Sequence, residues 1–333
     1  MKKLYPWQTK IWSQVNQDNN RMAHALLLYG RAGIGKLHFA RQFAQSLLCS
    51  HQIEENFACG TCPSCNWFNE GNHPDFRLLS PEQESDTDED IPTTKKSKKK
   101  TQISVSQIRE LSDFLNLTSH RSDGLRIVLI HPAEALNLAS ANALLKMLEE
   151  PASGVIFILV THHLQRLLPT ILSRCQKINM PIPDDVVALD WLNEQGVKNA
   201  RVQLSYLEGS PIKVFNEQIQ YSKFEEIWRM LSLGSKILPH VAAPILISNS
   251  VEIGIIALQK WIYDIVAIRY TFKARYHMSY SAALQVLAEN VNLSRLFQLQ
   301  TKIDTLRKLA SHPLNHELQM ESILLEYSKV FTN

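Results

Sequence analysis

Long apolar runs are scarce in this sequence. None reaches the roughly 18 uninterrupted apolar residues that a membrane-spanning helix needs, because four charged residues interrupt the most apolar stretch, 251–270. The first ten residues, MKKLYPWQTK, turn polar at once and lack the apolar centre of a secretory leader. We therefore expect a cytoplasmic protein with no membrane contact.

An excess of charge of one sign is also missing. The 35 Lys and Arg residues nearly balance the 32 Asp and Glu residues, and the net charge of +3 is too small to indicate nucleic-acid binding by itself. The composition, with 45% hydrophobic and 20% charged residues, is that of a globular protein. At 333 residues the chain exceeds one typical core, so we expect two or three domains.

Cysteine is rare, but four of the five cysteines lie close together in sequence. Cys59, Cys62 and Cys65 occur in the run CGTCPSC, and Cys49 precedes them. In a cytoplasmic chain such cysteines indicate a metal or reduced thiols before disulfides. Four thiolates favour Zn²⁺ in a closed tetrahedral site, which is structural because no position remains for water. An iron–sulfur cluster and unligated thiols are the alternatives.

The stretch 26–41, LLLYGRAGIGKLHFAR, has the pattern of a strand, a glycine-rich turn and a helix. Gly30, Gly35 and Lys36 fit the motif G-x-x-x-x-G-K-[ST], with Gly33 as a third glycine in the turn. In this motif, backbone N–H groups and the lysine bind phosphate. The next residue should carry a hydroxyl for Mg²⁺, but it is Leu37. The sequence predicts a phosphate cradle without one of its metal ligands.

The apolar run 125–130, LRIVLI, predicts a buried parallel strand. In a nucleotide hydrolase this strand ends in an acid that holds Mg²⁺. Here it ends in His131 and Pro132, and we expect Glu134 to be turned onto the next helix. Two independent losses, this acid and the hydroxyl at position 37, argue against hydrolysis.

The remaining pattern alternates strands and helices as far as about residue 160 and is helical in its last third. Residues 76–79 and 155–160 predict further strands, and residues 212–333 are helix-patterned throughout. Residues 81–101 consist of an acidic block and a lysine block with almost nothing apolar, so we expect a solvated loop there. The fold class is therefore α/β plus all-α.

The chain resembles the delta-prime subunits of bacterial DNA polymerase III clamp loaders, in the clamp-loader branch of the AAA+ superfamily. The resemblance covers almost the whole chain outside 81–101. It is carried by the turn at 30–37, the four cysteines, and four further segments. These are ANALLKMLEEP at 141–151, LLPTILSRCQ at 167–176, EGSP at 208–211 and PLNHELQMESILLEY at 313–327.

The resemblance implies a three-part fold. Residues 1–165 would form a RecA-like parallel-sheet domain of the AAA+ type, with a zinc module at about 49–66 and the charged loop 81–101. Residues 166–207 would form a small helical lid domain. Residues 208–333 would form a helical collar that packs side by side in a ring of five subunits.

The resemblance also implies a role in replication. The arginine of the family's S-R-C segment, here Arg174, reaches the ATP of a neighbouring motor subunit as an arginine finger. The implied partners are the gamma/tau motor subunits and the delta subunit, with the sliding clamp and primed DNA bound through the complex. Delta-prime proteins are described as non-hydrolysing, in agreement with Leu37 and His131. The intact glycines and Lys36 leave nucleotide binding open and keep an active AAA+ ATPase motor as the alternative. A zinc-dependent protein that binds nucleic acid alone is a third hypothesis.

Overall fold

The computed structural model describes residues 4–17, 22–53, 56–81, 102–116, 124–248, 250–309 and 315–331. The charged loop predicted at 81–101 lies almost entirely outside these residues. The chain divides into two compact units, Met1–Val187 and Ala188–Asn333. The first holds a parallel sheet and the second is helical, so the predicted fold class is confirmed.

The first unit is built on a five-stranded parallel sheet with the order β2-β3-β4-β1-β5. The strands are β1 (Ala25–Tyr29), β2 (Phe76–Leu79), β3 (Arg126–Ile130), β4 (Val155–Thr161) and β5 (Gln176–Asn179). The three central strands are almost completely buried, as expected for parallel strands covered on both faces. All strands run in one direction, so the segments that follow them meet at one edge of the sheet.

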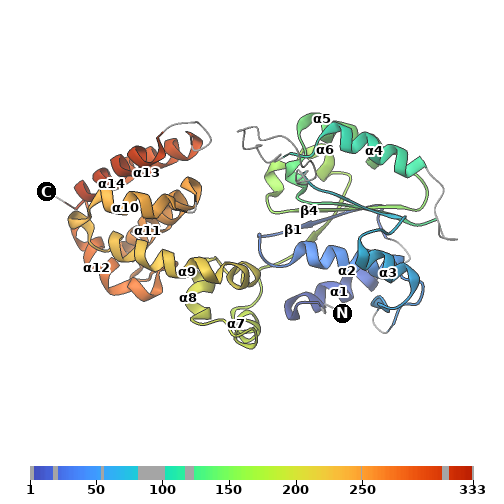
Figure 1. Cartoon of the computed structure of the whole chain (residues 1–333), viewed down its shortest axis with the longest axis horizontal. Helices are drawn as coiled ribbons and strands as arrows, with labels where there is room; N and C mark the ends of the chain where they lie inside the picture. Colours follow the sequence, from blue (N-terminus) through green and yellow to red (C-terminus); the bar gives the residue numbers. More distant parts are fainter. Residues whose placement is uncertain are drawn as a thin grey trace, which may run out of the picture. The chain divides into compact units, whose positions relative to one another are not determined.

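Helices cover both faces of this sheet (Figure 1). One face carries α4 (Val105–Asn116), α5 (Leu138–Glu149) and α6 (Pro169–Leu172), and the other carries α1 (Thr9–Gln17), α2 (Lys36–Leu48) and α3 (Pro63–Glu70). Neighbouring residues of one strand contribute to opposite faces: Leu27 packs in the core under α4 and α5. Leu26 and Leu28 pack in the core under α1 and α2. The alternation of side chains along each strand thus produces a three-layer domain.

The fifth strand was not predicted. Strand β5 has the sequence QKIN, its side chains are mostly exposed, and it pairs with β1 from Leu26↔Gln176 to Tyr29↔Asn179. A polar edge strand carries no apolar run, so composition does not reveal it. It falls within the range 166–207 expected for the helical lid.

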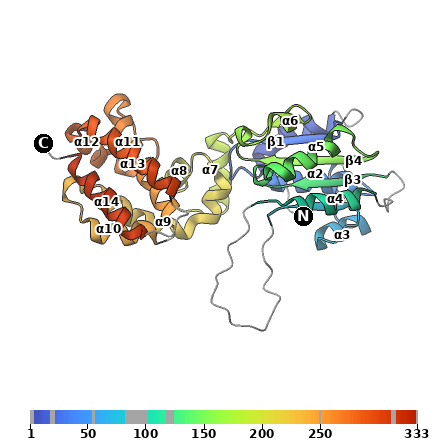
Figure 2. The same ribbon diagram turned by 90° about the horizontal axis from the view of Figure 1, so that it is seen from above.

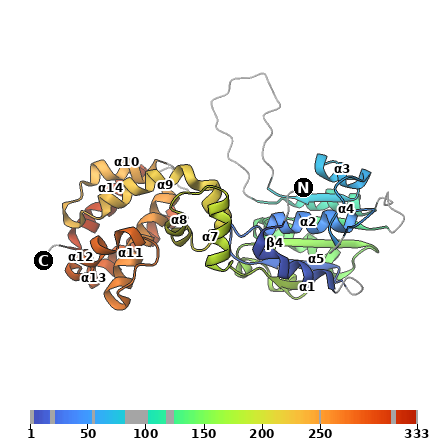
Figure 3. The same cartoon turned by 90° about the horizontal axis from the view of Figure 1, so that it is seen from below.

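The second unit contains two apolar cores. Helices α7 (Asp185–Glu194), α8 (Ala200–Tyr206) and the start of α9 (Pro211–Leu231) enclose a small one. The larger core is formed with the later helices, among which α10 and α14 lie side by side (Figure 2, Figure 3). The later helices are α10 (Pro239–Ile247), α11 (Val251–Thr271), α12 (Ser281–Asn290), α13 (Leu293–Leu309) and α14 (His316–Lys329). Pro211, which cannot donate a backbone hydrogen bond, occupies the first turn of α9, where none is needed.

In the described part of the chain, no single helix is long and apolar enough to cross a membrane, although α10 and α11 together, bent by 117°, meet the length and composition criteria.

Candidate functional site

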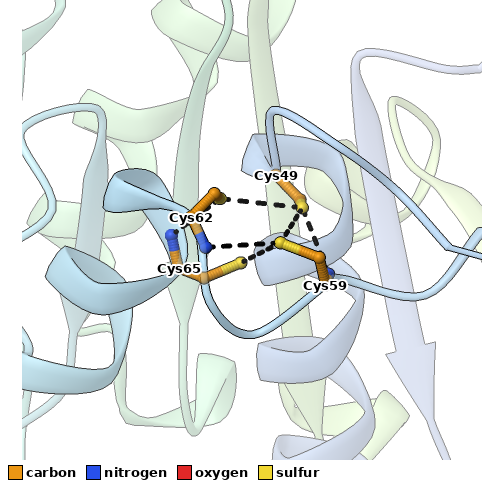
Figure 4. Close-up of side chains that lie close together, drawn as sticks. All are labelled: Cys49, Cys59, Cys62 and Cys65. Atoms are coloured by element: carbon orange, nitrogen blue, oxygen red, sulfur yellow. Dashed lines mark hydrogen bonds between the residues drawn. The ribbon is translucent and has the colours of Figure 1, made fainter.

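The four predicted cysteines converge at the end of α2 and the start of α3 (Figure 4). Cys49 ends α2, Cys62 is the N-cap of α3, and Cys65 lies in its first turn. The four sulfur atoms lie within 4.8 Å of one another. The separations from Cys49 Sγ are 3.6 Å to Cys59 Sγ and 3.9 Å to Cys62 Sγ, and Cys59 and Cys65 are 4.0 Å apart.

The three separations of 3.6 to 4.0 Å are close to those of a four-thiolate metal site. Four sulfurs at about 2.3 Å from a tetrahedral zinc ion lie about 3.8 Å from one another. Backbone N–H groups donate to three of the sulfurs, at 3.3 to 3.4 Å. The backbone N–H groups of Thr61 and Cys62 lower the pKa of Cys59 to about 6, while burial raises the pKa of Cys65. The cluster can therefore hold a metal ion, and all four ligands come from the chain itself.

A hydrogen-bonded group holds the cysteine-bearing segments together. Ser64 donates from Oγ to the carbonyl of Leu48, at 2.6 Å, and lies 2.9 Å from Nε2 of His73. Nδ1 of His73 accepts from the N–H of Asp75 at 3.0 Å, so Nε2 is the nitrogen that donates to Ser64. This serine–histidine pair cannot generate a nucleophile. The histidine donates its Nε2 proton to the serine oxygen, so it cannot accept the serine's proton as a base. It joins the end of α2, the start of α3 and the segment that leads into β2.

The predicted phosphate loop connects β1 to α2. Gly30, Gly33 and Gly35 have φ angles of 151°, 79° and 88°, which glycine adopts at low cost. A Cβ on Gly30 would lie 2.2 Å from the carbonyl oxygen of Met180. Lys36 is 2% exposed, and its Nζ donates to the carbonyls of Gly30 and Arg31, at 2.7 and 2.5 Å. The structure thus brings the three glycines and the lysine into one turn.

The N-terminal segment packs against this loop. Trp7 Nε1 and Gln8 Nε2 donate to the carbonyl of Ile34, at 2.9 and 3.1 Å, and Gln8 Nε2 also donates to that of Gly35, at 3.0 Å. The side chain at position 37 is a partly buried leucine packed against the core. The turn carries the lysine of the motif, but a hydrocarbon side chain stands where the motif has the hydroxyl that holds Mg²⁺.

The sheet edge beside the loop carries two histidines. His131 follows β3 and His162 follows β4, and their rings stand edge to face with centroids 5.4 Å apart. Burial, followed by the Lys36 charge, lowers the pKa of His162 to about 4. Burial also lowers the pKa of His131, although the Glu134 charge opposes it. Both rings are therefore neutral at pH 7.

Glu134 does not occupy the position of a metal-binding acid. It lies in a 3₁₀ turn, Ala133–Ala135, ahead of α5. Its carboxylate accepts from Thr161 Oγ1 at 2.7 Å and from the N–H of His162 at 3.0 Å. Burial raises its pKa, but these hydrogen bonds outweigh burial and lower it overall. Glu134 thus lies on the short 3₁₀ helix that follows β3, the next helical element, as expected, and its carboxylate links this helix to the end of β4.

Arg174 lies in the link between α6 and β5. Its guanidinium forms an ion pair with Glu149, with Nη2 2.6 Å from Oε1. Its Nη1 donates to the carbonyl of Thr170 at 2.9 Å and to Ser173 Oγ at 3.3 Å. Among the described residues these are its polar contacts, so it does not join the phosphate loop of its own chain. No local sequence signal marks Glu149 as its partner, although both residues lie in the segments that carry the family resemblance.

Comparisons with known proteins agree with one another. A family profile described as "DNA polymerase III, delta subunit" matches residues 7–184. The chain is 35% identical over 262 residues to the DNA polymerase III subunit delta' of Pseudomonas aeruginosa, covering 70% of this chain and 74% of that protein. It is 32% identical to subunit delta' of Escherichia coli, covering 62% of this chain and 58% of that protein. For subunit delta' of Bacillus subtilis the identity is 33%, covering 59% and 54%. The alignments thus span between about half and three quarters of these relatives.

Proposed function

Because this chain belongs to the family of DNA polymerase III delta' subunits, we propose that it is the non-hydrolysing subunit of a clamp loader. In this proposal it forms a five-subunit ring with gamma/tau motor subunits and a delta subunit, at the replisome in the cytoplasm. The ring places the sliding clamp on primed DNA. This chain contributes rigid structure and one arginine, and no ATP turnover of its own.

This proposal rests on the residues near the carboxyl ends of β1 and β3. Phosphoryl transfer needs metal ligands and an acid that orients water, and the three positions where they are expected hold Leu37, His131 and Pro132. The nearby acid, Glu134, is held by Thr161 and His162. A loop with Lys36 and neutral imidazoles beside it can bind an anion. These nitrogen groups are poor ligands for Mg²⁺, which prefers oxygen. Nucleotide binding without hydrolysis is compatible with this arrangement.

Arg174 is the residue that would act on a neighbouring subunit. Its side chain is 33% exposed, and the polar groups that it contacts in the described structure belong to its own chain. An arginine that stabilises charge on a transferring phosphoryl group contributes a factor of about 10³ or more to the rate. We assign Arg174 this role in the ATP site of the adjacent motor subunit.

We further propose that the cysteine cluster binds Zn²⁺ and that the ion is structural. The observation in support is a set of four thiols within 4.8 Å of one another, three of whose separations, 3.6 to 4.0 Å, are close to those around a tetrahedral zinc ion. We also propose a division into a sheet domain, a lid and a collar that begins at about residue 208. Because β5 (Gln176–Asn179) belongs to the sheet, the boundary between sheet domain and lid expected at 165/166 moves beyond this strand. The four cysteines would then belong to a small insertion that the ion fixes to the sheet domain.

The test is ATP turnover by the isolated protein and by the reconstituted loader, each with and without Arg174→Ala. We expect no turnover from the isolated protein. In the loader, the mutated site should lose about 10³-fold in rate, so total turnover falls by that site's share. The exposed residue Arg166 provides a matched control, because Arg166→Ala removes the same charge close by. Robust turnover from the isolated chain would instead support an active ATPase motor, the alternative favoured by its intact glycines and Lys36.

A further inference from the structure

The ion pair between Glu149 and Arg174 joins two segments that are 25 residues apart in sequence. Glu149 is the last residue of α5, and Arg174 lies just after α6. The contact between Oε1 and Nη2 is short, at 2.6 Å, while Nη1 is held by the carbonyl of Thr170 and by Ser173 Oγ. One terminal nitrogen of the guanidinium is thus fixed by the local chain, and the other is fixed by a separate helix.

Both partners are attached to rigid backbone. Leu148, next to Glu149, is 1% exposed, and Cys175, next to Arg174, is 8% exposed. Both belong to the same apolar core, together with the fully buried Ile171 of α6. The two charged side chains reach the surface beside these buried residues, so the position of the guanidinium depends on the contacts that they make there.

Stability does not account for this pair. The two side chains are 33% and 47% exposed, and ion pairs this exposed to water contribute little to folding. Orientation gives a better account, because an arginine that stabilises a transition state must be held in one of its many rotamers before the reaction. Within the described structure the three contacts use three of the five guanidinium N–H groups. Two N–H groups therefore remain for phosphate oxygens.

We propose that Glu149 is a positioning residue that holds the Arg174 side chain in the direction needed to reach a triphosphate bound by a neighbouring subunit. The inference rests on the proposed finger role of Arg174. Glu149 itself touches no reacting atom. Its carboxylate fixes Nη2, and the local carbonyl and hydroxyl fix Nη1, so the remaining N–H groups point in a defined direction.

The experiment measures kcat and KM for ATP in the reconstituted loader, with the chain carrying Glu149→Ala, Glu149→Gln, Arg174→Ala or both alanines. Glu150→Ala is the matched control, since Glu150 is the adjacent exposed acid. Glu149→Ala should lower kcat at the affected site about tenfold with KM unchanged. Glu149→Gln should lie between it and the wild type, because an amide oxygen still accepts from Nη2 without the charge. In the Arg174→Ala background, Glu149→Ala should have no further effect.

Each result separates the two proposals. If Arg174→Ala lowers turnover while Glu149→Ala behaves like Glu150→Ala, the positioning role is wrong and the finger role stands. If Glu149→Ala raises turnover, the carboxylate restrains the arginine and the positioning role is again wrong. If Arg174→Ala has no effect, both proposals fail. A loss that persists in the Arg174→Ala background, or that follows poorer assembly on size-exclusion chromatography, indicates structural damage and also contradicts the inference.

Discussion

At the scale of single residues, the phosphate loop depends on glycines for two separate reasons. A positive φ angle is costly for any residue with a Cβ, and a Cβ needs room. Any other residue at position 35 would incur both costs. The φ angle there is 88°, and a Cβ would lie 2.7 Å from Gln8 Nε2 and from the Tyr5 ring. Gly71, which caps α3, has a φ of 80°, but a Cβ there would meet nothing within 4 Å.

This pair of glycines allows the two costs to be measured separately. Gly71→Ala should lower the free energy of unfolding by about 1 kcal/mol, the cost of the backbone conformation alone. Gly35→Ala should lower it by about 1 to 3 kcal/mol more, because the N-terminal segment must move away. Urea unfolding of both variants provides the comparison. Equal losses would show that Tyr5 and Gln8 yield freely and that the close approach has no energetic weight.

A buried aspartate and a buried histidine lie side by side in the second unit. Asp264 is completely buried and accepts hydrogen bonds from the N–H groups of Arg275, Tyr276 and His277, at 2.7 to 2.9 Å, and from Nδ1 of His277 at 2.9 Å. The His277 ring is packed against Trp228 and Trp261, with centroids 5.1 and 5.0 Å away. Burial lowers the pKa of His277, outweighing the nearby Asp264 carboxylate.

The lowered pKa of His277 gives this unit a pH-dependent stability with a definite sign. The unfolded chain binds a proton on this residue near pH 6.5, above the pKa of the folded state. Stability is therefore fully present above pH 6.5 and is lost as the pH falls below it, by up to about 1.4 kcal/mol per pH unit. Urea unfolding at pH 7.5, 6.5 and 5.5 should show a smaller loss for His277→Gln than for wild type. The exposed-histidine variant His240→Gln should keep the wild-type slope, and identical slopes for all three proteins would refute the assignment.

At the scale of elements, the cysteine module shows how a short segment can be held without a large core. The three buried cysteines pack mainly against Ala58 and Cys59, a cluster too small to fold alone. The Ser64–His73 pair joins the same segments from the other side. A bound ion that supplies folding free energy is the expected complement.

Removing one thiol should therefore cost both the metal and stability. In Cys62→Ser the zinc content, measured by mass spectrometry of the metal, should fall from about one ion per chain to near zero. The free energy of unfolding should fall by roughly 2 kcal/mol or more. Cys175→Ser is the matched control, since Cys175 is buried in the core under α5 and α6 and lies outside the cluster. A wild-type protein free of zinc would disprove the assignment, and equal zinc loss in both variants would show that the effect is not local.

Elements with a strong local pattern were predicted from the sequence, and those defined by distant partners were not. The apolar run LRIVLI and the turn at Gly30 to Lys36 predict their own structure, because burial and glycine backbone freedom act within a few residues. Strand β5 exists through its pairing with β1, and its polar sequence contains no sign of that pairing. The role of Glu149 depends in the same way on a residue that only the packing of α5 against α6 brings near.

At the scale of the whole molecule, each of the two compact units is built on apolar clusters of its own. The sheet is packed on both faces by clusters drawn from the first unit. The large helical cluster contains residues from Tyr206 to Val330 of the second unit. Units with separate cores are expected to unfold as separate cooperative transitions.

The cysteine cluster lies in the first unit and the Asp264–His277 pair lies in the second. Each site therefore allows the stability of one unit to be changed separately. Calorimetry of the full chain should show two transitions. A zinc chelator should lower the midpoint of one by several degrees, consistent with a loss of about 2 kcal/mol, and leave the other in place. His277→Gln should shift only the second, because Asp264, His277 and their neighbours all lie in the helical unit. If calorimetry instead shows a single transition, and both the chelator and His277→Gln shift it, the two units unfold as one. The metal would then stabilise the helical unit as well.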